Sequence, residues 1–115
     1  MAGWLSTHVL DTGRGVPAAG VRVALYRVTG NAPKKIAEMV TNADGRTEAP
    51  ILQGRGFTVG GYELVFGAGA YLRGAGIADP FLDEVPVRFV VTDAAAHYHV
   101  PLLLSGFGYS TYRGS

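Results

Sequence analysis

The chain has no cysteine, which excludes disulfides, thiolate nucleophiles and cysteine-ligated metal sites. It also has no marked excess of either charge, since ten Lys and Arg residues stand against nine Asp and Glu residues. The densest basic cluster is the pair Lys34-Lys35, and the net charge is only +1. The basic patch that nucleic-acid-binding proteins need is therefore missing.

Long apolar runs are missing as well. No apolar stretch approaches the roughly 20 residues that a membrane-spanning helix requires. Residues Met1 to Trp4 do not show the basic region and apolar core of a signal peptide. From these absences we expect a soluble protein of the cytoplasm that binds neither membranes nor nucleic acid.

The length of 115 residues predicts one domain, spanning residues 1–115. With 48% hydrophobic residues the chain is able to fold alone, although around a modest core. Such a chain has little room for both a core and a deep pocket of its own. A small-molecule site is therefore expected to be shared between subunits.

Seventeen glycines and six prolines divide the chain into short segments rich in Val, Leu, Tyr, Phe and Thr. Many short strands with turn signals between them predict an all-β sandwich or barrel. One short helix is expected near residues 70–73, although its glycines disfavour it. About eight strands are expected, among them residues 5–12, 21–28, 36–41, 62–66, 87–93, 94–106 and 109–115.

Side chains alternate between the two faces of a strand. His8 and His99 are therefore expected on outward faces, and the residues expected to turn to the core are Val9, Val100 and Leu102. Pro101 lies inside a predicted strand although proline lacks a backbone N–H for the ladder. We expect a local interruption or an unpaired position there.

The three histidines are His8, His97 and His99. His97 and His99 are two residues apart on a predicted strand, which puts them on one face, roughly 7 Å apart. Three histidines without cysteine are able to form a zinc site with an open position. The alternative is that they are ordinary surface or hydrogen-bonded side chains, and spacing leaves both interpretations open.

Arg46 directly follows Asp44-Gly45, a dipeptide that strongly favours a tight turn. An arginine at such a place is commonly just a solvated loop residue. The functional alternative is a guanidinium that the turn fixes and directs into a cleft. Its planar fork of donors suits carbonyl or anionic groups.

Three segments together carry a wider pattern: "LSTHVLDT" near the start, "TNADGR" in the middle and "HYHVPLLLS" followed by "GYSTYRGS" at the end. In this combination the chain closely resembles the transthyretin-related 5-hydroxyisourate hydrolase family. The resemblance extends over essentially the whole chain, in the same order and spacing. The terminal "YRGS" is the family's signature and separates these enzymes from true transthyretins.

The resemblance implies a transthyretin-like sandwich of two four-stranded sheets with one short helix. It also implies a homotetramer, built as a dimer of dimers, with active sites in the channel between dimers. The implied reaction is hydrolysis of 5-hydroxyisourate to 2-oxo-4-hydroxy-4-carboxy-5-ureidoimidazoline, a step of urate degradation. The family uses no metal or organic cofactor.

Carried onto this chain, the family's motifs imply catalytic roles for His8, Arg46 and His99. They imply substrate contacts for His8 and Arg46, and also for Tyr112 and Ser115 in the tail. Histidine, with an unperturbed pKa near 6.5, suits the activation of water. Arg46 would disfavour the imidazolium form and stabilise an oxyanion. Which histidine is the base stays open, and the family motif gives His97 no role.

The chain departs from the family at Gly106-Phe107, where proline and tyrosine are usual, so we expect a looser turn before the last strand. A different class of function also stays open, namely a transthyretin-like carrier that binds an apolar ligand without catalysis. Retention of His8, Arg46, His99 and the terminal "YRGS" speaks against a carrier, because an apolar channel has no need of them.

Overall fold

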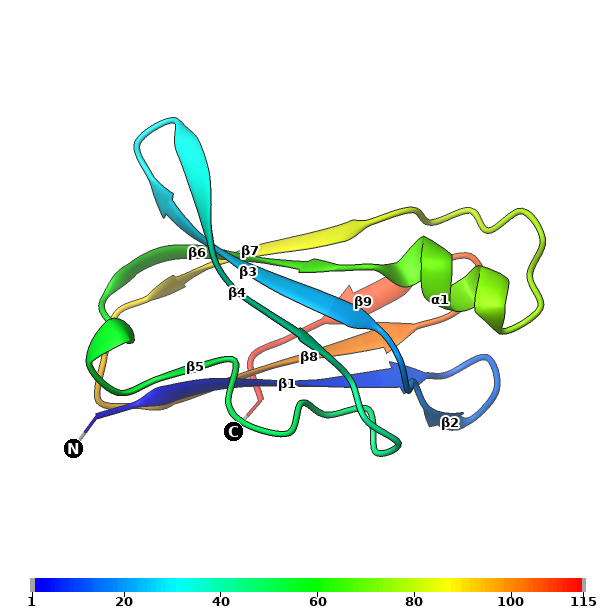
Figure 1. Ribbon diagram of the computed structural model, residues 1–115, viewed down its shortest axis with the longest axis horizontal. Helices are drawn as coiled ribbons and strands as arrows, with labels where there is room; N and C mark the ends of the chain where they lie inside the picture. Colours follow the sequence, from blue (N-terminus) through cyan, green and yellow to red (C-terminus); the bar gives the residue numbers. More distant parts are fainter. Residues whose placement is uncertain (1, 115) are drawn as a thin grey trace.

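A computed structural model describes residues 2–114 of the chain. Its strands form two facing sheets, and the short helix α1 (Ala68–Gly74) lies at one end of them (Figure 1). The strands are β1 (Trp4–Asp11), β2 (Val16–Pro17), β3 (Arg22–Thr29), β4 (Ala32–Val40), β5 (Leu52–Gln53), β6 (Gly60–Phe66), β7 (Val85–Val91), β8 (His97–Leu104) and β9 (Tyr109–Thr111).

One sheet has the order β2-β1-β8-β9, with β5 also pairing with β1, and the other has the order β4-β3-β6-β7. Within the first sheet β1 and β8 run parallel to each other. The prediction of an all-β sandwich of two sheets with one short α-helix is thereby confirmed. One sheet has five strands instead of four, because two very short strands, β2 and β5, both pair with β1.

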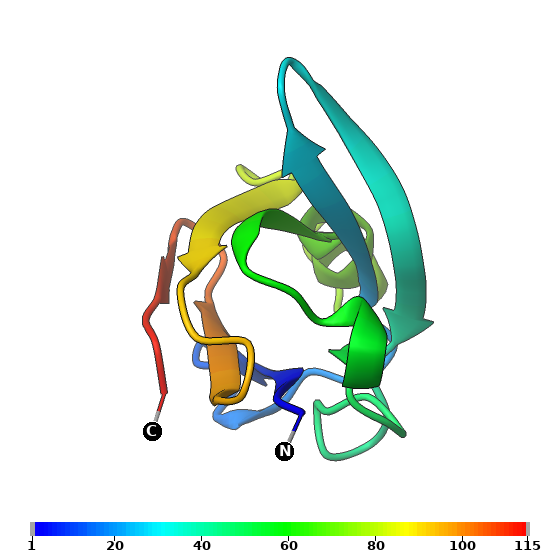
Figure 2. The ribbon, with the colours of Figure 1, turned by 90° about the vertical axis from the view of Figure 1, so that its left-hand side faces the viewer.

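The core fills the space between the two layers, which Figure 2 shows from one end. Strand β1 alternates as its sequence predicts: Leu5, Thr7 and Val9 are buried, whereas His8 is only half-buried. The other core residues expected from strand alternation, Val100 and Leu102, are buried too. Burial of large apolar side chains from both sheets stabilises the layers against each other.

The hairpin of β3 and β4 projects beyond the rest of the sandwich (Figures 1 and 2). The strands expected over residues 21–28 and 36–41 leave residues 29–35 as the turn between them, but β4 already begins at Ala32, so the turn is formed by Gly30 and Asn31. Pro33 is accommodated because β4 is an edge strand, where a missing backbone N–H costs little. Local composition misplaced the start of this strand by four residues.

Strand β8 runs through Pro101 without ending. Its ladder with β9 stops at the pair Leu102–Thr111, and contact resumes only as an isolated bridge between His99 and Gly114. The expected interruption at Pro101 is confirmed only for the ladder with β9, because Pro101 keeps its place opposite His8 in the ladder with β1. The expectation of a last strand over residues 109–115 is wrong, because regular pairing ends at Thr111.

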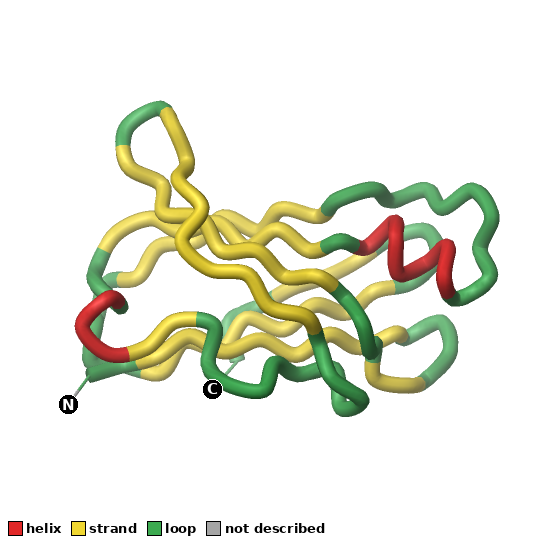
Figure 3. Tube along the Cα trace, in the orientation of Figure 1, coloured by secondary structure: helices red, strands yellow, loops and turns green. Residues whose placement is uncertain are grey.

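The glycine-rich sequence of residues 52–61 predicts a loop, but this segment contains β5, one turn of 3₁₀-helix over Gly54–Gly56 and the start of β6 (Figure 3). Helix α1 covers the predicted residues 70–73 and extends beyond them at both ends. None of the helices within residues 2–114 is long and apolar enough to cross a membrane.

Candidate active site

Two histidines of β8 and one of β1 meet on the outer face of the five-stranded sheet. The parallel register pairs Trp4 with His97, Ser6 with His99 and His8 with Pro101. The ring centroids of His97 and His99 are 5.9 Å apart, in keeping with their predicted position on one face. All three histidines are half-buried, so each is accessible from this face.

The turn expected at "NADGR" forms against β1. The side-chain oxygen of Asn42 accepts hydrogen bonds from the backbone N–H groups of Asp44 at 2.9 Å and Arg46 at 3.2 Å. Gly45 has φ = 75° and its carbonyl accepts a 2.8 Å hydrogen bond from the N–H of Val9. A Cβ at residue 45 would lie 2.3 Å from the carbonyl oxygen of Val9, so this position requires glycine.

This turn brings Arg46 beside His8. The two residues form an isolated antiparallel bridge, and Nε2 of His8 lies 2.8 Å from the carbonyl oxygen of Asp44. A carbonyl oxygen only accepts hydrogen bonds, so Nε2 of His8 carries the proton. In the neutral ring, Nδ1 of His8 then holds the free lone pair.

His99 occupies the middle of the site. Its Nδ1 lies 2.8 Å from Oγ of Ser6, which leaves Nε2 as the ring nitrogen free for a substrate or water. Burial lowers the pKa of His99 below 6.5, and the charge of Arg46 lowers it further, followed by smaller effects of His97 and His8. His99 is therefore neutral near neutral pH, which agrees with the expected effect of Arg46 on a nearby histidine.

The C-terminal tail, residues 112–114, also lies against His99. The N–H of Gly114 donates a 2.7 Å hydrogen bond to the carbonyl of His99, and the guanidinium of Arg113 lies 4.0 Å from the ring centroid of Tyr98. A Cβ at residue 114 would lie 2.6 Å from Cδ2 of His99, so only glycine lets the tail lie this close.

Of the two tail residues expected to contact substrate, Tyr112 is not brought to the histidines in this structure. Tyr112 is 59% exposed and lines a cavity of about 290 Å³ between β7 and the tail. Ser115 lies outside the described residues. Three of the five predicted site residues, His8, Arg46 and His99, are thus gathered on one face.

Sequence reasoning missed three contributions to the site. Oγ of Ser6 lies between His97 and His99, the indole of Trp4 stacks on His97, and the carbonyl of Asp44 holds His8. Strand alternation already put Ser6 on the face of His8. The pairing of β1 with β8 was the missing information, because it joins residues more than 90 positions apart.

The zinc alternative lacks a set of ligands. Within residues 2–114, no group of three or more His, Asp and Glu side chains is arranged to hold a metal ion. His97 and His99 both direct a ring nitrogen to Ser6 instead.

The face of the sheet is only slightly hollowed in a single chain. A cavity of about 180 Å³ lies beside Ser6, Arg46 and Glu48. Typical small-molecule pockets measure about 300–1,000 Å³, so this cavity is small for a private binding site.

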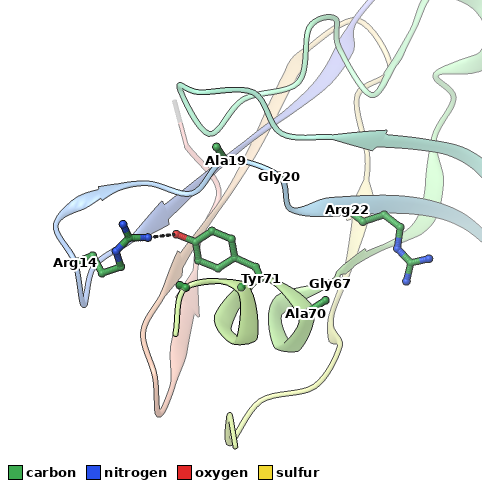
Figure 4. A pocket seen from close by; sticks show the side chains of 9 residues that line it. Arg14, Ala19, Gly20, Arg22, Gly67, Ala70 and Tyr71 are labelled. Carbon is green, nitrogen blue, oxygen red and sulfur yellow. Dashed lines mark hydrogen bonds between the residues drawn. The ribbon is translucent and has the colours of Figure 1, made fainter. Parts of the chain in front are cut away.

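A larger cavity, of about 570 Å³, lies beside α1 and away from the histidines (Figure 4). Its polar side chains already have partners: Tyr71 donates to Asp11 at 2.7 Å and Arg14 donates to the Tyr71 hydroxyl at 3.5 Å. Arg22 donates to Glu84 at 3.0 Å. Burial and the neighbouring Asp11 raise the pKa of Tyr71. The contacts of Tyr71 attach α1 to β1, and we interpret this network as structural.

Two facing sheets, a short end helix and a polar histidine–arginine site on an outer face define a transthyretin-like sandwich protein. The profile of the HIUase/Transthyretin family matches residues 5–114. The chain belongs to this family.

Among its relatives, "5-hydroxyisourate hydrolase 2" of Rhizobium meliloti is 56% identical over 117 residues, covering 99% of this chain and 98% of the relative. The structure of Klebsiella pneumoniae 5-hydroxyisourate hydrolase has a TM-score of 0.83 and 38% identity, covering 97% of this chain and 99% of that one. An (S)-allantoin synthase structure has a TM-score of 0.91 and 47% identity. The match covers 99% of this chain but only 44% of the (S)-allantoin synthase chain.

The fold alone does not separate catalysis from binding in this family. Sea bream transthyretin, solved in complex with thyroxine, has a TM-score of 0.88 and 30% identity, over 96% of this chain and 93% of that one. The residues on the outer face must therefore decide between the two functions.

Proposed function

We propose that the protein hydrolyses 5-hydroxyisourate to 2-oxo-4-hydroxy-4-carboxy-5-ureidoimidazoline in urate degradation. The observation that carries this proposal is the half-buried His99, kept neutral beside Arg46 on an accessible face. Hydrolysis of a cyclic amide needs a base that is unprotonated near neutral pH, and such a histidine meets this need. Curated relatives that match nearly the full chain carry the same activity in their names.

In the proposed reaction, Nε2 of His99 takes a proton from water while the water oxygen adds to the lactam carbonyl. The guanidinium of Arg46 stabilises the oxyanion that forms on this carbonyl oxygen. The ring C–N bond then breaks, and the imidazolium of His99 returns its proton to the leaving nitrogen. Nδ1 of His8, which holds a free lone pair, accepts a hydrogen bond from a substrate N–H.

We also propose that the active form is a homotetramer, a dimer of dimers with the sites in the channel between dimers. The small cavity at Arg46 supports this proposal, because a second copy facing the sheet would enclose the substrate. Large exposed apolar side chains, Val90, Phe107 and Tyr112, are further candidates for contacts between copies. Substrate contacts by Tyr112 and Ser115 stay predictions that this assembly would accommodate.

A carrier for an apolar ligand is the competing function, as thyroxine binding by sea bream transthyretin illustrates. The outer face here carries an arginine and three histidines, and an apolar ligand would leave the guanidinium and the second ring nitrogen of each histidine without hydrogen bonds. Burying such groups unpaired costs about 1–3 kcal/mol each, so this face favours a polar substrate.

The test generates 5-hydroxyisourate from urate and follows its decay with and without the protein, in ¹⁸O-labelled water. We expect accelerated decay and one labelled oxygen in the new carboxylate of the product, and both should persist after treatment with a strong chelator. Decay at the spontaneous rate would exclude the enzyme. The cytoplasmic location expected from the sequence stays a prediction, which fractionation of cells that contain the protein tests.

A further inference from the structure

Ser6 joins two histidines of which only one has a part in the proposed reaction. Its Oγ lies 2.6 Å from Nε2 of His97 and 2.8 Å from Nδ1 of His99. Both distances are those of good hydrogen bonds. The three side chains therefore form one continuous chain, His97–Ser6–His99, across β1 and β8.

Contacts within the fold fix the positions of all three hydrogen-bonded side chains. Ser6 and His99 are direct partners in the parallel register, and His97 precedes His99 by two residues on the same face. Trp4, the register partner of His97, stacks on the His97 ring with centroids 4.3 Å apart and planes inclined by 14°. The orientation of His97 is therefore fixed by the indole on one side and the Ser6 hydroxyl on the other.

The number of available protons restricts which side chain donates and which accepts in each of these two hydrogen bonds. A serine hydroxyl has one proton, so if it bonds two ring nitrogens it donates to one and accepts from the other. The proposed reaction requires a lone pair on Nε2 of His99, which puts the ring proton on Nδ1. Nδ1–H of His99 then donates to Ser6, and Ser6 donates to Nε2 of His97.

The His99 and His97 rings differ in the charged and aromatic groups that surround them. His99 is half-buried and lies near the positive charge of Arg46, with His8 as a further neighbour. Glu48 is the acidic residue that lines the adjoining cavity, together with Ser6 and Arg46. His97 instead lies against the face of Trp4, whose negative electrostatic potential attracts a cation. His97 therefore has an aromatic contact able to stabilise a proton that is passed to it.

We propose that Ser6 and His97 are positioning residues, through which Ser6 fixes the tautomer of His99 and His97 shares the proton that His99 gains. As Nε2 of His99 takes a proton from water, Nδ1 gives its proton to Oγ of Ser6, which gives its own to Nε2 of His97. The transfers reverse when the leaving nitrogen is protonated, so no proton is gained or lost. This inference rests on the proposed role of His99 as the base.

The tautomer is measured independently of activity, by ¹⁵N NMR of the ring nitrogens in the full-length protein without substrate. We expect the neutral His99 ring to carry its proton on Nδ1 in the wild type. In Ser6→Ala this preference should be lost. A His99 ring protonated on Nε2 in the wild type, or an unchanged tautomer in Ser6→Ala, would overturn the assignment.

The kinetic test compares Ser6→Ala with Ser6→Thr, which restores a hydroxyl. We expect kcat to fall about tenfold or more in Ser6→Ala with little change in KM, and to recover largely in Ser6→Thr. Ser105→Ala is the matched control, because it also removes a serine hydrogen bond but lies six residues beyond His99, about 20 Å along the strand. Equal losses in the Thr and Ala variants, or an equal loss in the control, would overturn the proposal.

His97→Phe keeps an aromatic ring against Trp4 but has no nitrogen to share a proton. We expect the kcat of His97→Phe to be close to that of Ser6→Ala. The double variant should have a kcat no lower than either single variant, because both changes break the same series of hydrogen bonds. If His97→Phe has the kcat of the wild type, His97 does not share the proton that His99 gains. If the wild type itself has no hydrolase activity, the proposed function fails, while the NMR result still decides the tautomer.

Discussion

At the scale of single residues, the charge of Arg46 acts on His99, in addition to the substrate contact proposed for Arg46. Its guanidinium and the burial of the ring both keep the pKa of His99 below 6.5, with burial the larger cause. Since the unprotonated ring is the active form, activity should persist as the pH falls through 6.5 and decline only below the lowered pKa.

Arg46→Gln removes the largest cause of the lowered His99 pKa after burial. The pKa of His99 then rises back toward 6.5, so the acid limb of kcat/KM should move to higher pH. Loss of oxyanion stabilisation should also reduce kcat by about 100-fold. The pH profile of kcat/KM measures both effects, with Arg73→Gln on the exposed surface of α1 as the matched control. An acid limb that stays in place would contradict the electrostatic role of Arg46.

Gly114 places the tail against the His99 ring, and the absence of a side chain makes this possible. In Gly114→Ala the new Cβ would meet Cδ2 of His99 at 2.6 Å, so the ring must shift. Because small displacements of a catalytic group are costly, we expect the rate to fall about tenfold or more.

Gly108→Ala is the control for this change, since no atom lies within 4 Å of a Cβ at residue 108 and its φ is not positive. Both variants should keep the wild-type melting temperature within a few degrees, as measured by circular dichroism. Equal activity in the two variants would mean that the tail does not position His99.

At the scale of elements, the turn over residues 42–46 determines where Arg46 lies. Asn42→Ala removes two hydrogen bonds to backbone N–H groups, each contributing about 0.5–1.5 kcal/mol. We expect a lower melting temperature together with a lower kcat/KM. Asn31→Ala, at the exposed tip of the β3–β4 hairpin, should change neither quantity. A destabilised Asn42→Ala variant with full activity would show that the turn does not control the position of Arg46.

Local sequence pattern predicted much of this architecture but not the contacts between distant strands. The alternation of β1 identified its buried residues, and Asp44-Gly45 identified the turn before Arg46. Pro101 was correctly expected to interrupt a ladder, because its missing N–H is a local property. The partnership of Ser6 with His97 and His99 depends on β1 lying parallel to β8, which no local pattern encodes. The early start of β4 was missed because Pro33 is tolerable only on an edge strand.

At the scale of the whole molecule, the site on a single chain is an open face with a small cavity. If facing dimers enclose the substrate, the specific activity should depend on assembly. We expect a solution mass near four times the 12.1 kDa of the chain. On dilution, the specific activity should fall together with the fraction of tetramer. Light scattering and rate measurements at matched concentrations follow these two quantities. A monomer that keeps the full rate would contradict the shared site.

The central claim is that His99, kept neutral on the outer face of the five-stranded sheet, enables this chain to hydrolyse 5-hydroxyisourate. The most direct measurement is the first-order decay constant of 5-hydroxyisourate near neutral pH, with wild-type protein, with His99→Ala and with buffer alone. We predict strong acceleration by the wild type and a loss of about 100-fold or more in His99→Ala, which we expect to keep its fold. A wild-type decay no faster than in buffer, or equal rates for the two proteins, would contradict the claim.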